Sequence, residues 1–192
     1  IDAMDFVRNA MRKGDFRMEL RYSTNDKEYP ENNLDSLQSR ELFSEELIRQ
    51  IEDIPGVEKV EREYSALVEI DHRAYEEPDC VSSINRQDIE IMEPNLRRGE
   101  LDYDRMLAED GVLFAWDARF DENGFSIGDT IQFNIILGDR KIPYEGTIMA
   151  SSYDGGAEFY MPEERLEELM QGTDATSGLY ISVAEDSYDQ VK

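Results

Sequence analysis

The chain has 192 residues, enough for one ordinary hydrophobic core or for two small lobes that share an interface. Acidic side chains outnumber basic ones by 45 to 20, which gives a formal net charge of −25. A field of this sign repels phosphate backbones and anionic lipid surfaces, so no nucleic acid is expected as a partner. The single cysteine, Cys80, excludes an internal disulfide, and the apolar runs are too short to span a bilayer.

Apolar residues recur with helical or strand periodicity through the first seventy residues. The pattern predicts, in chain order, a helix over 1–11, a strand over 16–22, an exposed loop over 23–37, a helix over 43–54 and a strand over 57–70. One face of the second helix would carry Phe43, Leu47, Ile51 and Ile54. Pro55 disfavours helical geometry at the residue before it and Gly56 tolerates a left-handed cap, so this pair should end the helix.

The remainder of the chain predicts a mixture of short helices and strands, which is typical of an α+β fold. The expected elements are a loop over 71–86, a strand over 88–92, a turn over 94–99, a helix over 101–109, a strand over 112–116, a turn over 121–124, a hairpin over 131–148, a turn at 155–156, a strand over 157–161, a helix from Pro162 and a strand over 178–184. In the hairpin, Ile131, Phe133 and Ile135 should point inward, and Gly138-Asp139 should turn the chain. Pro162 suits the first helical position.

Catalytic motifs are scarce, because the chain contains no GxSxG, P-loop, GxGxxG or HExxH pattern. The only histidine, His72, lies close in sequence to Cys80, so a Cys–His nucleophile pair is one interpretation. No third orienting group or local signature accompanies the pair, which favours a surface histidine and a half-buried cysteine. One His and one Cys also cannot complete a zinc site without carboxylates. We assign no catalytic, cofactor-binding or metal-binding residue.

The carboxylates suggest two further hypotheses. An EF-hand loop with Gly124 at its sixth position would have Asp121 and Asn123 in suitable places, but Arg119 and Thr130 would occupy positions that require carboxylates. An irregular carboxylate site for calcium over 117–129 stays an alternative.

Adjacent acidic pairs are read as solvated helix faces rather than as glycosidase carboxylates, which need a defined separation across a cleft. These pairs are Glu45-Glu46, Glu76-Glu77, Glu163-Glu164 and Glu167-Glu168. A ligand groove lined by loop tyrosines is a further alternative to ordinary surface positions, with Tyr29, Tyr75, Tyr153 and Tyr188 as candidates.

Several short motifs are spread along most of the chain. They are Ile54-Pro-Gly-Val57-Glu-Lys-Val60, Arg97-Arg-Gly99 with Leu101–Trp116, Gly128-Asp129-Thr-Ile131-Gln-Phe133, Tyr144-Glu-Gly146-Thr-Ile148, and Phe159-Tyr-Met-Pro162 with Leu166. In this order, over about residues 16–184, they resemble the MacB-like core domain of FtsX/LolC/SalY-type ABC transporter permeases. Residues 71–95 match no pattern of that family. Gly128-Asp129 should form a tight turn in which the Asp side chain binds nearby backbone amides.

The resemblance implies an α+β, MacB-like extracytoplasmic domain with two lobes, in which mixed β-sheets pack with helices. Residues 1–70 and 121–192 would form the main β-α-β lobe, and 71–120 an inserted second lobe. Implied partners are transmembrane helices of the same permease, a separate cytoplasmic ATPase subunit and a second permease subunit. The domain would bind a peptide, lipoprotein or antimicrobial ligand or a partner protein, or transmit conformational change. The resemblance implies no catalytic residues. The low cysteine count is typical of a Gram-positive-like surface.

Two other classes of protein stay open: a free surface or secreted ligand-binding module not linked to transport, and an intracellular hydrolase using Cys80 or paired carboxylates. Ser187-Tyr-Asp-Gln190 has the capping-box spacing that begins a helix, and only two residues follow it. We therefore expect the parent protein to continue on both sides, with roughly twenty apolar residues adjoining each end.

Overall fold

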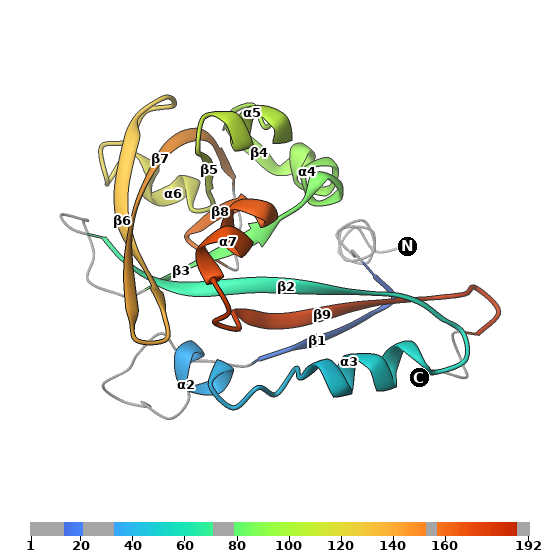
Figure 1. Ribbon diagram of the computed structural model, residues 1–192. Coiled ribbons are helices and arrows are strands. Elements are labelled where there is room, and N and C mark those ends of the chain that lie inside the picture. Colours follow the sequence, from blue (N-terminus) through green and yellow to red (C-terminus); the bar gives the residue numbers. More distant parts are fainter. Residues whose placement is uncertain (1–13, 21–32, 71–78, 153–156, 188–192) are drawn as a thin grey trace.

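The computed structural model describes residues 14–20, 33–70, 79–152 and 157–187 (Figure 1). Its strands are β1 Phe16–Glu19, β2 Val57–Glu69, β3 Asp79–Ile84, β4 Leu96–Gly99, β5 Gly111–Phe114, β6 Thr130–Leu137, β7 Arg140–Ser152, β8 Phe159–Pro162 and β9 Thr176–Val183. Its helices are α2 Leu34–Gln38, α3 Glu45–Glu52, α4 Arg86–Met92, the 3-10 turn η2 Glu93–Asn95, α5 Tyr103–Ala108, α6 Asp117–Phe120 and α7 Glu163–Met170. This mixture confirms the α+β class.

The strands pair in the order β1-β9-β2-β3-β8-β5-β7-β4, and β6 pairs with both β2 and β7. Most pairs are antiparallel, whereas β3–β8 and β5–β7 are parallel. In this order, the run from β2 to β7 begins and ends with the two strands that β6 pairs with. The strands β2, β3, β8, β5, β7 and β6 therefore form a closed ring. We call these strands the ring. Closure removes most exposed strand edges.

The ring and the helices that cover it enclose the largest hydrophobic core of the described residues. Alternation along β6 turns Ile131, Phe133 and Ile135 inward, as predicted. Several aromatic side chains fill the centre of this core. The Phe133 and Phe159 rings stack with their centroids 4.9 Å apart, and the centroid of the Phe114 ring lies 5.5 Å from that of Phe159. Such ring pairs add about 0.5–1.5 kcal/mol each to the stabilisation that burial provides.

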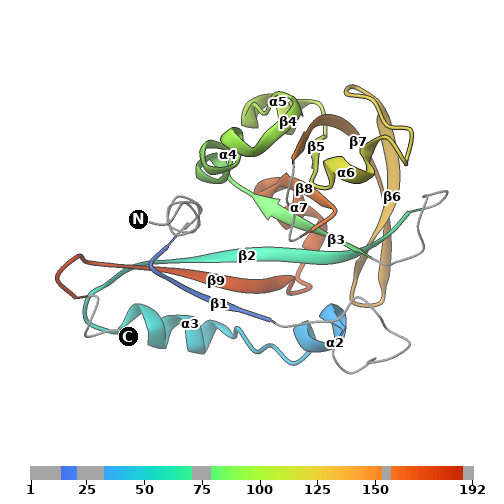
Figure 2. The same ribbon diagram turned by 180° about the vertical axis from the view of Figure 1, so that it is seen from behind.

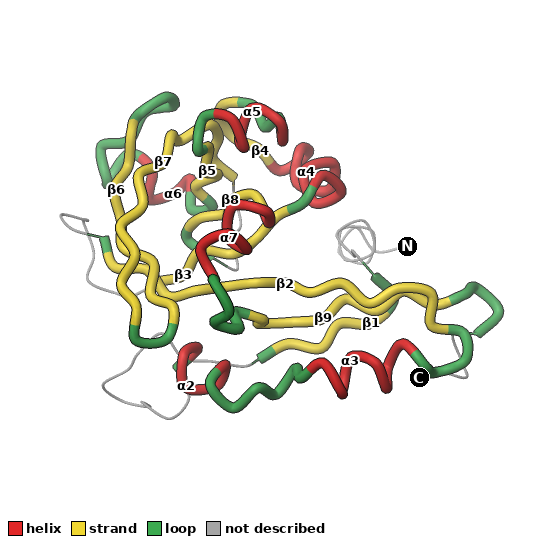
Figure 3. The backbone as a smooth tube through the Cα atoms, viewed as in Figure 1, coloured by secondary structure: helices red, strands yellow, loops and turns green. Residues whose placement is uncertain are grey.

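A second layer extends away from the ring, where β1, β9 and the first half of β2 form an antiparallel ribbon (Figure 2). Helix α3 lies along one face of this ribbon (Figure 3). Its apolar side packs Ile48 and Ile51 against Leu179 and Ile181 of β9. The ribbon and the ring therefore have separate cores and share strand β2.

The predicted helix over 43–54 is confirmed as α3, with two corrections. Ser44 caps the first turn, so the helix begins at Glu45. Ile54 lies beyond the end of the helix and is 38% exposed. Ile48, which was not among the residues of the predicted apolar face, is buried instead. Gly56, with a φ of 96°, ends the segment as expected.

Four other local predictions are wrong in part. The predicted strand over 88–92 is helix α4, because Asn85 and Asp88 form a capping box that favours a helix. The predicted loop over 71–86 contains β3, and the predicted turn over 94–99 contains η2 and β4. Helix α2 begins inside the predicted loop over 23–37, capped by Asn33.

The remaining element predictions agree with the structure where it describes the chain. Strands β1, β2, β5, β8 and β9, the β6–β7 hairpin and helices α5 and α7 occupy the expected segments. Pro162 caps α7 instead of taking its first helical position, while the acidic Glu163 and Glu164 open the helix. The expected helix over 1–11 and the turn at 155–156 lie outside the described residues.

Strand pairing crosses the predicted lobe boundary. Strand β5, from the predicted insert 71–120, pairs with β7 and β8, which belong to the predicted main lobe. Residues 79–120 thus contribute strands to the ring, and the division into 1–70 with 121–192 and 71–120 stays a prediction.

A substitution at Gly99 can test how closely the backbone of β4 approaches that of β7. Its φ is +71°, and an added Cβ would lie 2.0 Å from the Met149 carbonyl oxygen. We expect Gly99→Ala to lower the free energy of unfolding by roughly 3 kcal/mol or more, because backbone strain and a backbone clash add together. Urea denaturation measures the change.

Gly124→Ala is the matched control, since Gly124 has a similar φ of +70° but open space around an added Cβ. It should cost only about 1–2 kcal/mol, the cost of left-handed geometry alone. Equal losses for the two variants would show that β4 does not approach β7 as closely as described.

Candidate functional site

The structure places the candidate nucleophile beyond the reach of a substrate. Cys80 lies on β3 with 1% exposure and packs against Leu34, Leu67 and Ala157. It is fully buried, so the expectation of a half-buried cysteine is corrected. His72 lies outside the described residues, and a Cys–His pair is therefore not observed.

The acidic loop over 117–129 binds an arginine of the same chain. Arg98 donates from Nε to Asp117 (2.9 Å) and from both terminal nitrogens to Asp121 (2.8 and 3.0 Å). Ser151 donates to the same Asp117 oxygen at 2.6 Å. The hydrogen bonds from Arg98 hold the pKa of the Asp121 carboxyl below its usual value. In the ranges that the structure describes, no group of three or more His, Cys, Asp or Glu side chains gathers as a metal site.

The adjacent acidic pairs make local contacts instead of facing one another across a cleft. Glu45 contacts Arg62, and Glu164 accepts a hydrogen bond from the Tyr103 hydroxyl. Glu168 pairs with Arg165 one turn away on α7 (2.7 Å). Glu76-Glu77 and the candidate groove tyrosines Tyr29, Tyr75, Tyr153 and Tyr188 lie outside the described residues.

The turn at Gly128-Asp129 forms as predicted. Gly128 has a φ of 91° and donates from its backbone N–H to the Ile148 carbonyl at 2.8 Å. The Asp129 carboxylate accepts from the Ser126 backbone N–H at 2.8 Å. The first bond anchors the beginning of β6 to β7 and the second closes the turn, so the motif is a fold device.

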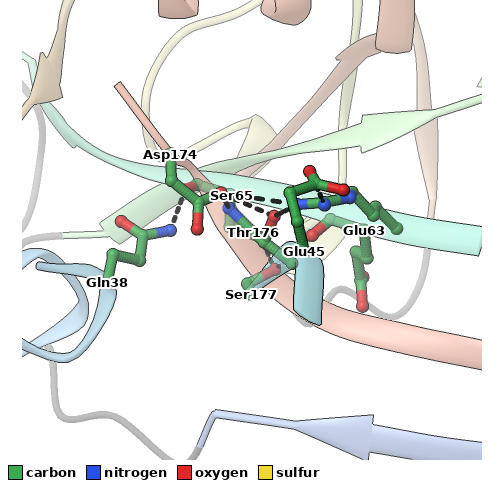
Figure 4. Close-up of polar contacts among 8 residues, drawn as sticks. Gln38, Glu45, Glu63, Ser65, Asp174, Thr176 and Ser177 are labelled. Carbon is green, nitrogen blue, oxygen red and sulfur yellow. Dashed lines mark hydrogen bonds and ion pairs between the residues drawn. The ribbon is translucent and has the colours of Figure 1, made fainter. Parts of the chain in front are cut away.

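A group of buried polar side chains lies where β2 changes partners, and Figure 4 labels three of them, Gln38, Ser65 and Ser177. The last β2–β9 pair is Tyr64↔Thr176, and the first β2–β3 pair is Ser65↔Ser82. We call Gln38, Ser65, Ser82 and Ser177 the polar junction. These side chains belong to α2, β2, β3 and β9, so the group lies between the ribbon and the ring.

Hydroxyl groups link the three strands directly at the polar junction. The Ser65 Oγ lies 2.6 Å from the Ser82 Oγ and 2.9 Å from the Ser177 Oγ. Gln38 Nε2 donates to the Ser65 carbonyl at 2.8 Å, and Ser177 Oγ donates to the Glu63 carbonyl at 3.2 Å. All four residues of the junction are at most 7% exposed. A buried polar network of this kind fixes one register, because each shifted register would leave hydroxyls without partners.

A charged contact extends the junction toward α3. Arg62 donates to Thr176 Oγ1 at 3.0 Å and contacts Glu45 of α3. Asp174 accepts from both the backbone N–H (2.9 Å) and the hydroxyl (2.6 Å) of Thr176. Helix α3 and strands β2 and β9 are thereby joined around the bulge at Ser177 of β9, opposite Glu63 and Tyr64 of β2.

The neighbouring Tyr64 stays a neutral hydrogen-bonding group near neutral pH. Burial, followed by the negative charge of Glu167, raises the pKa of its hydroxyl to about 12. The polar junction itself consists of three hydroxyls and one amide, groups that can both donate and accept hydrogen bonds. Sequence reasoning missed this site; the available signal was Ser65 inside an otherwise apolar strand half.

No protein-family model matches the chain, and the search of curated proteins gives no match. Among solved structures, the chain is similar to the extracellular domain of the noncanonic ABC-type transporter YknZ from Gram-positive bacteria. The identity is 16%, the TM-score 0.48, and the match covers 92% of this chain and 88% of that one. It is also similar to the periplasmic region of MacB from Actinobacillus actinomycetemcomitans, at 10% identity and a TM-score of 0.44, covering 72% of this chain and 63% of that one.

None of the helices within the described ranges has the length and apolar character of a membrane-spanning helix.

Removing the central hydroxyl of the junction should destabilise the fold. We expect Ser65→Ala to lower the free energy of unfolding by about 2 kcal/mol, because Ser82 and Ser177 each lose a buried partner. Urea titration followed by circular dichroism measures the loss.

Ser39→Ala serves as the control, since the Ser39 hydroxyl is exposed and bonds only within its own turn. It should change stability by less than about 0.5 kcal/mol. A Ser65→Ala effect as small as that of the control would contradict the structural role of the junction.

Proposed function

We propose that this chain is an extracytoplasmic domain of an ABC transporter permease subunit that binds a substrate or partner protein and transmits conformational change toward the membrane. One observation supports this most strongly. The described fold begins and ends at adjacent positions: Asp15 donates its backbone N–H to the Ile181 carbonyl (2.9 Å), and Val183 donates to the Asp15 carboxylate (2.8 Å). Two membrane helices attached before β1 and after β9 would meet the domain at one place.

The long strand β2 gives this arrangement a mechanical path. Val57 pairs with Val183 near the paired ends, and Val68 pairs with Asp79 and Ile135 in the ring. Thirteen residues of strand extend roughly 40 Å. A displacement at the paired ends would reach the ring through continuous hydrogen-bonded strand, and the polar junction keeps the two parts in register.

The partners follow from this proposal. They are transmembrane helices of the same permease, a separate cytoplasmic subunit that hydrolyses ATP, and a second permease subunit. The ligand would be a peptide, a lipoprotein or an antimicrobial compound. We infer recognition and transmission, not catalysis, because the Cys80 thiol is buried and the carboxylates Asp117 and Asp121 hold Arg98.

Surface labelling of the native protein in intact cells tests the location. Glu122 is exposed in the turn after α6, so Glu122→Cys should react with a membrane-impermeant maleimide. The unmodified protein is the matched control, because buried Cys80 should react little. The labelled protein should sediment with membranes and resist a carbonate wash.

Labelling that requires permeabilised cells would contradict the extracytoplasmic location. Labelling of a protein that the carbonate wash releases would instead favour a free surface or secreted module.

A further inference from the structure

The turn that follows helix α6 contains the asparagine of this chain that is most prone to deamidation. Asn123 is the only asparagine in the chain that is followed by glycine. In such a pair the backbone nitrogen of the glycine can attack the side-chain amide carbon of the asparagine, because glycine has no Cβ to hinder the approach. The proposed function gives these two residues no role.

Two hydrogen bonds hold the atoms that this reaction would use. The Gly124 backbone N–H, whose nitrogen would attack, donates to the Asp121 carbonyl at 3.0 Å. The Asn123 Nδ2, which would leave, donates to the Arg119 carbonyl at 2.8 Å. Both bonds must break before the nitrogen can reach the amide carbon, so the closed turn opposes the reaction.

Contacts with other elements brace the closed turn. Arg98 of β4 donates from both terminal nitrogens to the Asp121 carboxylate (2.8 and 3.0 Å). The Phe125 backbone N–H donates to the Phe120 carbonyl at 3.1 Å. The Phe125 ring packs edge-on against Phe114 and Phe120, with centroids 5.2 and 6.0 Å apart. The turn therefore opens only if Phe125 and Arg98 also loosen their contacts.

We propose that Asn123-Gly124 is a latent deamidation site, protected while the turn is closed and reactive when the turn opens. In the reaction the Gly124 nitrogen loses its proton and bonds to the Asn123 Cγ. The Cγ–Nδ2 bond breaks, and Nδ2 takes up a proton and leaves as ammonia. Water from the solvent then opens the resulting succinimide at either carbonyl, which gives aspartate or isoaspartate. The inference does not depend on the proposed function.

The reaction would make an opening of the turn irreversible. In isoaspartate the backbone runs through the former side chain of Asn123, which lengthens it by a methylene group before Gly124. Phe125 would then be displaced from its place against the ring core. The new carboxylate cannot donate to the Arg119 carbonyl, and it adds a negative charge two residues from Asp121. Chains that have reacted should therefore unfold at lower urea concentration.

Deamidation rates at mildly alkaline pH test the proposal. The probes are the 192-residue chain, folded or unfolded in urea, and an acetylated, amidated peptide of residues 119–126 in the same solutions. The folded chain should deamidate at least about tenfold more slowly than the peptide, since two hydrogen bonds must break first. The unfolded chain should react at the rate of the peptide. Mass spectrometry of digests and an isoaspartate methyltransferase assay measure the products.

A variant tests whether closure of the turn controls the rate. Arg98→Ala removes the brace on Asp121 and should speed deamidation of the folded chain at least about threefold. Arg105→Ala is the matched control, because Arg105 pairs with Glu109 on α5 at 2.9 Å, and it should leave the rate unchanged. A cooperative urea transition confirms that each variant is folded.

Hydrogen exchange in the unmodified chain gives a measurement that needs no variant. The Gly124 amide should exchange at least about tenfold more slowly in the folded chain than in the peptide, because the same opening exposes it.

Three results would overturn the proposal: equal deamidation rates in the folded chain and the peptide, no acceleration on unfolding, or a Gly124 amide that exchanges as fast as in the peptide. Equal rates for folded Arg98→Ala and Arg105→Ala would overturn it too, because closure of the turn would then not control the reaction.

Discussion

The physical constraint on which the rest of the structure depends is the sharing of strand β2. Its first half pairs with β9 and belongs to the ribbon, while its second half pairs with β3 and β6 and belongs to the ring. A single strand cannot shift by one residue in one half only, since every side chain would change face. Ribbon and ring are therefore fixed in register by one continuous backbone, and Ser65 marks the point of change.

The few basic residues of the chain are used as connections between distant elements. Arg98 joins β4 to α6, Arg62 joins β2 to α3, and Arg165 joins α7 to Asp110 at 3.1 Å. Each exposed pair contributes little to stability alone. Their larger effect is on the charge distribution. Because these arginines are already paired with carboxylates, they do not neutralise the other acidic side chains on the surface. A surplus of one sign opposes the close approach of two copies of the chain.

Periodicity and punctuation in the sequence predicted much of the fold. The β6–β7 hairpin followed from the alternation of Ile131, Phe133 and Ile135, and the end of α3 followed from Pro55-Gly56. Helix α4 was missed because it has no buried residue, and Asn85, which begins its capping box, lies outside the predicted segment. Alternation also fails to predict the burial of Leu67. Its side chain lies on the other face of β2 from Ala66 and Val68, but it is buried too, because α2 covers that face.

The sites were less predictable than the elements. The acidic loop was considered as a calcium site, and only the structure shows that Arg98 occupies Asp117 and Asp121. The polar junction joins residues 38, 65, 82 and 177, whose separations in sequence carry no local signal.

Native-state hydrogen exchange tests most directly whether β2 couples the ribbon to the ring. If the coupling holds, the amides of Tyr64, Ser65 and Ala66 open with the same free energy as those of Val60 in the ribbon and Val81 in the ring, since all are exposed only by global unfolding. The opposite result would be fast exchange at Tyr64–Ala66 together with different opening free energies on the two sides. Ribbon and ring would then be independent units, and β2 would transmit nothing between them.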